Sequence, residues 1–416
     1  MRLLVHDYGR YAFTYELAVK LAQRGHEVVY AFSDLDSVRA DLGDDVGGRL
    51  TLLPIKGGEK LVKDSLFKRY QIEVNHGKIL GNHIRRIRPD VILSGNTPLE
   101  AQWRMMAAAK EVNARFLYWM QDILSIAAHR ILPAKLPVVG NLVAKHMENL
   151  ERKMARASEG VVVIANGFVE TLNQWNVDGR KVSVIENWAP AIGAAEAEQV
   201  AKWKKEHGID GKRVILYSGT LGMKHKPELL LELADKLNSR EDVALVVIAE
   251  GPGADWLREQ VAANPKKNLQ ILSFQPFSMM PTTLGSSDVL IVLLEADAGE
   301  FCVPSKTLTY MRAAKPILGG MPLSNLASQI VMRERMGYVV EPHDVDGFVE
   351  KGLALIDNPA LSSEMGANAK AYADSTFDLE SISTKFEMLM QAVHKEGRTE
   401  GTAAPATATA PKARVS

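Results

Sequence analysis

The sequence predicts an α/β protein built from two domains, each with a parallel β-sheet. The chain has 416 residues, whereas single hydrophobic cores stop growing at roughly 250 to 300 residues. Short β-rich runs alternate with amphipathic helical stretches, as in parallel strands joined by crossover helices. The alternation pauses at a stretch of small residues after Pro190 and then restarts. We therefore expect two doubly wound sheets in tandem.

The first domain is expected over residues 1–189. It opens with a strand at 3–6, a helix at 14–23 and a strand at 28–32, which together form a βαβ unit. The runs that follow are strongly apolar, as strands buried on both faces of a parallel sheet are. We expect these further strands at 91–94, 116–119, 161–164 and 182–185, and a helix at 99–112.

The second domain is expected over residues 190–375. Its predicted strands lie at 214–218, 245–249, 269–274, 289–294, 317–319 and 338–340, with a helix at 227–237. Within segment 376–395, apolar residues at helical spacing predict a helix over 379–394 that packs back on the first domain. Residues 396–416 are rich in Ala, Thr and Pro, so we expect a disordered tail.

Composition restricts the partners. Lys plus Arg equals Asp plus Glu at 50 each, so no overall field favours nucleic acid. Cys302 is the single cysteine, which excludes an internal disulfide and is ordinary for a reducing compartment. The apolar run at the N-terminus is too short for a signal peptide, and no run approaches the roughly 20 apolar residues of a spanning helix. We expect a cytoplasmic protein that reaches a membrane only from its surface.

One amphipathic stretch, residues 131–157, combines Leu, Val and Met with basic side chains. A stretch of this kind contacts an anionic membrane in some proteins. The alternative, a helix with a buried apolar face and a solvated basic back, stays open, and two prolines restrict where the helix starts. The basic residues are Lys135, Lys145, Arg152, Lys153 and Arg156.

Ligands of open parallel sheets collect at the carboxyl ends of the strands, so the loops that follow strands carry the functional predictions. Residues 218–226 form such a loop, in which Gly219 lets the backbone approach a diphosphate and Lys224 supplies positive charge. The loop does not match the Walker pattern G-x-x-x-x-G-K-[ST]. The alternative is that Lys224 and Lys226 are a solvated pair.

Two further loops of the second domain are candidates. Glu250 to Gly253 form a turn whose glycines relieve crowding near a ligand, although a tight turn alone also explains them. In residues 300–307, Pro304 suits a helix start and leaves the amides of Ser305 and Lys306 free for an anion. Alternatively, Ser305 is only an N-cap.

The remaining signals are weaker. The loop 6–10 holds Gly9 but lacks G-x-G-x-x-G, so an anion-binding loop and a plain turn remain alternatives. The Asp-x-Asp sequences at 34–36 and 344–346 fall in polar turns, and we expect no metal there and no cofactor. Cys302 is interpreted as a small buried filler.

Taken together, these segments resemble family 4 of the retaining glycosyltransferases, over nearly the whole chain. Residues 17–28 are similar to the opening helix and second strand of the family. Residues 304–316 resemble a branch that builds colanic-acid-like exopolysaccharides and surface-antigen sugars, as do residues 119–122 and 185–188.

The resemblance implies the GT-B fold, two Rossmann-like domains facing a central cleft. It also implies metal-independent transfer of a sugar, with retained configuration, from a UDP- or GDP-linked donor to a saccharide or polyprenyl-diphosphate-linked acceptor. Such an enzyme would work in the cytoplasm, in peripheral contact with the inner face of the plasma membrane. The site residues carried over are Asp122, Lys224 and Glu300 for catalysis, and Gly9, Gly219, Thr220, Lys224, Glu250, Gly251, Gln275, Pro304, Ser305, Lys306 and Thr309 for the donor.

The sequence departs from the family at three positions. Phe301 and Thr309 stand where the family has two glutamates, with Glu300 adjacent to the first, and Thr220 replaces an arginine. By the resemblance, Lys224 and Lys306 would then neutralise phosphate, and Thr309 would contact the ribose. A nucleotide-sugar epimerase and a non-catalytic sugar-nucleotide-binding protein remain alternatives.

Overall fold

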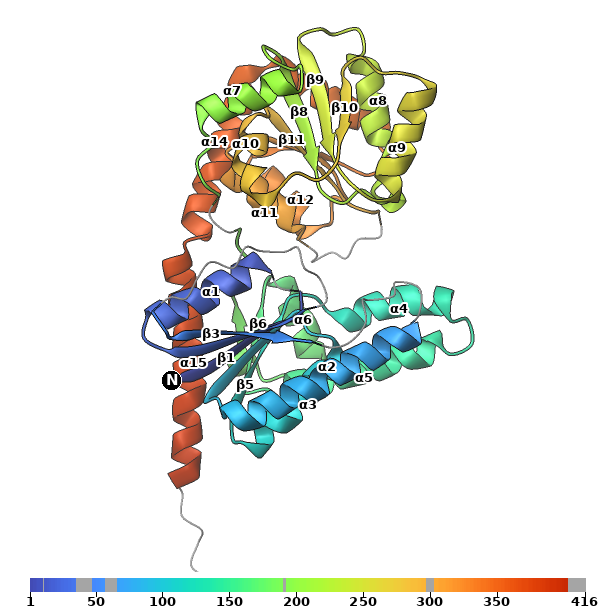
Figure 1. Ribbon diagram of the computed structural model, residues 1–416. Helices are drawn as coiled ribbons and strands as arrows, with labels where there is room; N and C mark the ends of the chain where they lie inside the picture. The colour runs from blue at the N-terminus through green and yellow to red at the C-terminus, as the bar shows by residue number, and fades with distance from the viewer. Residues whose placement is uncertain (10, 35–46, 57–65, 190–191, 297–302, 403–416) are drawn as a thin grey trace, which may run out of the picture. The chain divides into compact units, whose positions relative to one another are not determined.

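The computed structural model describes residues 1–9, 11–34, 47–56, 66–189, 192–296 and 303–402. It divides into two compact units, each with its own parallel sheet (Figure 1). Unit 1 comprises residues 1–185 and the chain from Glu380 on, and unit 2 comprises residues 186–379. The predicted fold class, α/β with two Rossmann-like sheets, is confirmed.

Unit 1, in its described part, has a seven-stranded parallel sheet in the order β3-β2-β1-β4-β5-β6-β7. Its strands are β1 (Arg2–Asp7), β2 (Glu27–Ser33), β3 (Leu50–Ile55), β4 (Val91–Gly95), β5 (Arg115–Met120), β6 (Gly160–Val163) and β7 (Val182–Val184). Its helices are α1 (Ala12–Gln23), α2 (Leu66–Ile87), α3 (Leu99–Glu111), α4 (Leu124–Lys135), α5 (Gly140–Ala157), α6 (Gly167–Gln174) and α15 (Leu379–Thr402), with a 3₁₀ turn η1 (Gly179–Lys181). Every strand predicted for this half is present, and β3 was not predicted.

Unit 2 has a six-stranded parallel sheet, among its described residues, in the order β10-β9-β8-β11-β12-β13. Its strands are β8 (Arg213–Ser218), β9 (Val243–Ile248), β10 (Leu269–Leu272), β11 (Val289–Leu293), β12 (Ile317–Gly320) and β13 (Gly337–Val340). Its helices are α7 (Ala197–Glu206), α8 (Glu228–Leu237), α9 (Pro252–Ala263), α10 (Met280–Gly285), α11 (Ser305–Arg312), α12 (Leu326–Arg333), α13 (Val345–Asp357) and α14 (Pro359–Thr376), with 3₁₀ turns η2 (Met223–His225) and η3 (Phe277–Met279). All six strands match predicted ones.

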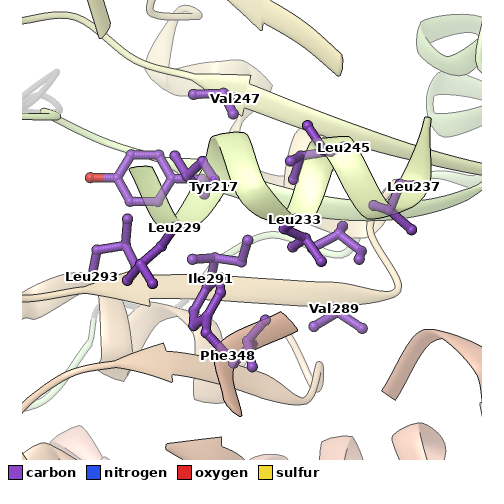
Figure 2. Close-up of a cluster of buried hydrophobic side chains, with 14 of the residues drawn as sticks. Tyr217, Leu229, Leu233, Leu237, Leu245, Val247, Val289, Ile291, Leu293 and Phe348 are labelled. Atoms are coloured by element: carbon purple, nitrogen blue, oxygen red, sulfur yellow. The ribbon is translucent and has the colours of Figure 1, made fainter. Parts of the chain in front are cut away.

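The core of unit 2 fixes the strand ends that carry the site. Figure 2 shows α8 with Leu229, Leu233 and Leu237, which recur every four residues and so share one face of the helix. They pack with residues of β8, β9 and β11, among them Tyr217, and Phe348 of α13 joins the same cluster. Tyr217 is the penultimate residue of β8, so this packing also holds the loop that begins at Ser218.

Helix α15 packs within unit 1. Phe386 is fully buried, and its ring lies 4.8 Å from that of Trp119 on β5. Arg24, just after α1, forms ion pairs with Glu380 at 2.7 Å and Glu387 at 2.9 Å. The helix runs to Thr402, so the first part of the predicted tail continues it, and residues 403–416 lie outside the described residues.

Candidate functional site

The carboxyl ends of the strands of unit 2 gather most of the predicted residues. Strand β8 has β9 on one side and β11 on the other, so the chain order reverses at β8. Crossover helices therefore leave in opposite directions from this point, which is where open parallel sheets open a crevice for ligands. Gly219 and Thr220 follow β8, and Glu250 and Gly251 follow β9.

These two loops are joined by their backbones. The Leu221 amide donates to the Glu250 carbonyl, and the Gly253 amide donates to the Leu221 carbonyl, both at 2.9 Å. Gly251 has a φ of +114°, and a Cβ there would lie 2.9 Å from the Leu221 oxygen. The glycine at 251 is therefore required by the contact between the two loops, with or without a ligand.

Lys306 projects from α11 toward the carboxyl end of β8 and the loop that follows it. Its ammonium donates to the hydroxyl of Tyr217 at 3.1 Å and lies over that ring, 4.3 Å from the centroid. The Tyr217 hydroxyl in turn donates to the Thr220 carbonyl at 2.8 Å. Burial lowers the pKa of Lys306 to about 8. Lys306 is half-buried, with protein atoms closely surrounding its ammonium beside the Gly219 loop, and no carboxylate in the described part of the chain forms an ion pair with it.

Tyr310 fastens α11 to the end of β8. Its hydroxyl accepts from the Ser218 amide at 3.2 Å and donates to the Ser218 carbonyl at 3.1 Å. Pro304 is the N-cap of α11 and Ser305 the first helical residue, without a side-chain cap bond. The alternative that Ser305 serves as the N-cap is therefore wrong, and the expected helix start at Pro304 is confirmed.

Lys224 and His225 lie in η2, in the loop after β8. Lys224 is 64% exposed and forms an ion pair with Glu295, which follows β11. His225 Nδ1 accepts from the Gly222 amide at 3.0 Å, so a neutral His225 carries its proton on Nε2. Burial, and then the positive charges of Lys306 and Lys224, lower the pKa of His225. The charges of both lysines therefore act on His225.

The other donor residues lie at the same edge with looser contacts. Gln275 follows β10 and its amide donates to the Ser273 carbonyl at 3.0 Å, while Glu250 is exposed. Thr309 is half-buried on α11 and donates to the Ser305 carbonyl at 3.2 Å. Glu300 lies outside the described residues, as do Phe301 and Cys302.

Gly9 and Asp122 belong to unit 1. Asp7, the last residue of β1, accepts from the Gly9 amide at 3.0 Å and the Tyr11 amide at 2.6 Å. Burial raises the pKa of Asp7 to about 7, against hydrogen bonds from these amides and from the side chains of Thr14 and Asn96. The carboxylate therefore organises the loop that holds Gly9.

A row of polar side chains follows the strands of unit 1. Asn96, after β4, has a φ of +48° and donates to Gln121 Oε1 at 2.8 Å, next to the end of β5. Asp122 is exposed at one side, yet protein atoms surround its carboxyl closely enough that desolvation raises its pKa to about 6. Asp7, Asn96 and Gln121 thus link three neighbouring strand ends beside Asp122.

Several of these residues were not predicted as site residues. A usable signal existed for all but Tyr310, because the others end a strand or lie in the loop after one, where ligands of parallel sheets bind, whereas Tyr310 lies inside α11. What the sequence could not supply was the pairing of side chains from different loops. The residues are Asp7, Asn96 and Gln121 in unit 1, and Tyr217, His225, Glu295 and Tyr310 in unit 2.

Among the described residues, no group of three or more His, Cys, Asp or Glu side chains is arranged to hold a metal ion. Asp344, in the second Asp-x-Asp sequence, accepts from the Gly347 amide at 2.9 Å and caps α13. That sequence is therefore the start of a helix, and the expectation of a polar turn at 344–346 was wrong. Of the first, Asp34 lies in a turn, and Asp36 falls outside the part of the chain that the structure describes.

Comparison with known proteins adds independent findings. Residues 199–372 match the family model for glycosyl transferases group 1, and residues 9–188 match the glycosyl transferase 4-like domain. A relative named for colanic acid biosynthesis, the glycosyl transferase WcaI of Escherichia coli (strain K12), is 24% identical over 306 residues, 73% of this chain and 74% of its own. A GDP-mannose-dependent mannosyltransferase of Corynebacterium glutamicum is 24% identical over 41% of this chain and 44% of its own.

Solved structures share the fold. Anabaena HepE, in complex with UDP-glucose, has a TM-score of 0.67 at 14% identity, covering 94% of this chain and 100% of its own. The lipopolysaccharide-biosynthesis glycosyltransferase WaaG has a TM-score of 0.65 at 14% identity, and the match covers 92% of this chain and 98% of the WaaG chain. The two family models together span most of both units, and the chain belongs to glycosyltransferase family 4, as a GT-B enzyme similar to the colanic acid and exopolysaccharide branch.

Proposed function

We propose that this enzyme transfers a sugar from a UDP- or GDP-linked donor to a saccharide or polyprenyl-diphosphate-linked acceptor during exopolysaccharide or surface-polysaccharide synthesis. The observation that carries the proposal is Lys306, a half-buried and desolvated cation with no described carboxylate partner, beside the glycine loop at the point where strand order reverses. A buried charge is stable only with compensation, and the diphosphate of a nucleotide sugar supplies it.

The chemistry proposed for this site is stabilisation of the leaving diphosphate. Negative charge grows on the diphosphate as the glycosidic bond breaks, so preorganised cations and amides at Lys224, Lys306 and the start of α11 lower the barrier. The turn after β9 and Gln275 would hold the base, and Thr309 the ribose. In unit 1, Asp122 and the loop with Gly9 would contact the acceptor and the transferred sugar. We include retention of the anomeric configuration of the transferred sugar in the proposal because the family resemblance implies it.

The test begins with ligand binding. A ligand that binds only the folded state, present at about 100 times its Kd, stabilises the protein by about 2.7 kcal/mol. We expect UDP or GDP, and one of their sugars, to raise the melting temperature, whereas AMP does not. Turnover is then measured with saccharide and polyprenyl-diphosphate acceptors.

The same assay separates the alternatives. An epimerase forms a new nucleotide sugar without any acceptor, and a non-catalytic binding protein is stabilised without turnover over the whole acceptor panel. Product that contains both donor sugar and acceptor establishes transfer. An anomeric assignment of that product by NMR decides between retention and inversion.

Replacing Lys224 with alanine is expected to keep the fold and to lower kcat/KM at least about tenfold, or about 1.4 kcal/mol. The side chain is largely exposed and already paired with Glu295, so its contribution should be smaller than that of a buried cation. Steady-state kinetics measure the effect. Unchanged kinetics in this variant would remove Lys224 from the site.

Treatment with EDTA is expected to leave activity intact. The proposed site neutralises the diphosphate with side-chain and helix-terminal charge, so no step of the proposal requires a metal ion. Activity is compared before and after dialysis against EDTA. Complete loss that Mn²⁺ restores would contradict this proposal and return attention to the Asp-x-Asp sequences.

We also propose that the enzyme works in the cytoplasm at the inner face of the plasma membrane, where a polyprenyl-linked acceptor would be presented. Within the described residues, no helix is both long and apolar enough to cross a membrane. Contact with the bilayer would then involve a surface of the protein.

A further inference from the structure

Helices α4 and α5 of unit 1 carry a concentration of exposed apolar side chains. The two helices lie side by side and extend beyond the sheet (Figure 1). Large hydrophobic side chains are exposed around the loop that joins them, with Val138 at 89% and Leu142 at 72%. We call this set the apolar tip: Ile131, Val138, Val139, Leu142 and Val143. Single exposed hydrophobic residues are normal, but a contiguous group marks an interaction surface.

The joining turn is held rigidly. The Leu136 amide donates to the Leu132 carbonyl and the Gly140 amide to the Leu136 carbonyl, both at 2.7 Å. Gly140 is buried, and a Cβ at this position would overlap the backbone of Leu132. The close approach therefore requires glycine and fixes Val138 on the outside, whereas a connecting turn of this kind is ordinarily polar.

The charges around the tip all have one sign. Residues 123–147 contain no Asp or Glu, but they contain Arg130, Lys135 and Lys145. Lys145 and His129 both contact Glu148, which lies one turn further along α5. The outer end of the hairpin is thus apolar and basic, which agrees with the anionic-membrane alternative for residues 131–157 and not with a helix whose apolar face is fully buried.

We propose that the apolar tip inserts into the interfacial region of an anionic lipid bilayer and that the exposed Lys135 contacts its acidic head groups. Exposed aliphatic side chains gain by leaving water for the head-group and acyl boundary, and each nearby basic residue adds attraction to acidic lipid. The absence of acidic side chains from residues 123–147 removes the repulsion that would oppose this contact. The inference names the surface for the membrane contact proposed above, and it requires neither donor binding nor transfer.

The test uses the full chain and sedimentation with vesicles, without nucleotide or acceptor. One set of vesicles is phosphatidylcholine with about one third phosphatidylglycerol, and the other is phosphatidylcholine alone. At about 0.1 M salt we expect partitioning onto the anionic vesicles to be at least about tenfold stronger, and to weaken in about 0.5 M salt because charges are screened.

The double substitution Val138→Glu with Leu142→Glu is expected to lower partitioning onto anionic vesicles at least about tenfold. The control is Met388→Glu, which places one such carboxylate at a 65% exposed side chain of α15 in the same unit, and partitioning should not change. Lys135→Glu should weaken binding to anionic vesicles and leave the slight binding to neutral ones unaltered.

Three results would overturn the proposal: no partitioning of the wild-type chain, equal partitioning of the Val138→Glu, Leu142→Glu variant, or an equal loss in Met388→Glu. Self-association of the wild-type chain that the double variant abolishes, seen by analytical ultracentrifugation, would assign the tip to contact between copies. The thermal shift with UDP and GDP is measured on each variant. A thermal shift that is retained in a variant shows that the variant is folded. If neither nucleotide shifts the melting temperature of the wild-type chain or of any variant, that result counts against the proposed function and not against the membrane proposal.

Discussion

Replacing Lys306 with alanine is expected to lower kcat/KM at least about 100-fold, or about 2.7 kcal/mol. The half-buried Lys306 holds its ammonium over the ring of Tyr217, and no described carboxylate pairs with it, so its charge is available to the diphosphate. A preorganised cation in a site of low polarity stabilises developing charge far more than an exposed one. Steady-state kinetics with the donor varied measure the loss.

Two controls accompany this variant. Lys267→Ala removes an exposed lysine of the same unit and should leave kcat/KM unchanged. Removing a desolvated cation relieves a burial penalty, so Lys306→Ala should melt no lower than the wild-type protein in the absence of nucleotide. A variant that melts normally and retains full kcat/KM would exclude Lys306 from the site.

The pH dependence of nucleotide binding gives a second readout for Lys306. Its pKa is lowered to about 8, so the side chain is mostly charged at pH 7 and loses its charge as the pH rises through 8. A diphosphate binds the charged form, and the affinity for UDP or GDP should therefore fall above about pH 8. Calorimetric titrations from about pH 7 to 9 measure this fall. It should be absent in Lys306→Ala, and a fall of equal size in that variant would assign the titration to another group.

Most of the fold was predictable because strands buried on both faces of a parallel sheet are short apolar runs, which can be recognised in the sequence. Every residue of β4 and of β11 is buried; β11 is a continuous apolar run, and β4 begins with three apolar residues, Val91 to Leu93. Strand β3 was missed for a physical reason. It lies at the edge of its sheet, and Pro54 interrupts its run, which is tolerated where one side of a strand makes no ladder.

Helix faces were predicted less accurately than helix positions. In α15, the helical spacing of Ile382, Phe386, Leu389 and Val393 predicts one buried face. Ile382, Phe386 and Val393 are buried, but Leu389 is only half-buried and Met390 takes the core position. Residues 131–157 were interpreted as one amphipathic stretch, whereas Pro133 lies inside α4 and a separate turn precedes α5. Local spacing does not show which side of a helix the next element covers.

The positions of the candidate site residues in the fold could be predicted, but the contacts between their side chains could not. Glycine loops and lysines after strands are visible in the sequence, and this was enough to select Gly219, Lys224 and Lys306. The contact of Lys306 with Tyr217 depends on strand order, since β8 and β11 are neighbours in space although β9 and β10 intervene in sequence. The ion pair of Lys224 and Glu295 depends on the same neighbouring of β8 and β11, because Lys224 follows β8 and Glu295 follows β11.

Replacing Gly219 with alanine is expected to lower kcat/KM roughly 30- to 100-fold by displacing Lys306. A Cβ at residue 219 would lie 2.7 Å from the Lys306 ammonium and 3.1 Å from its Cε atom, so the side chain must move. The φ of +139° adds backbone strain for any residue but glycine. A displacement of about 1 Å at a positioning group costs about 100-fold in rate. Kinetics and the melting temperature are measured together.

The control variant Gly208→Ala separates the effect of backbone strain from the effect of displacing Lys306. Gly208 also lies in unit 2 with a positive φ, +62°, but nothing lies within 4 Å of the added methyl group. Both variants should therefore melt at lower temperature, while only Gly219→Ala loses activity.

The double variant Gly219→Ala with Lys306→Ala completes a cycle that isolates the coupling between the two residues. If the methyl group acts by moving the ammonium, then adding Gly219→Ala to Lys306→Ala should cause almost no further loss of kcat/KM. Losses that multiply would show that the glycine serves the donor directly, through its backbone. The glycine would then be required for the ligand and not for the position of Lys306.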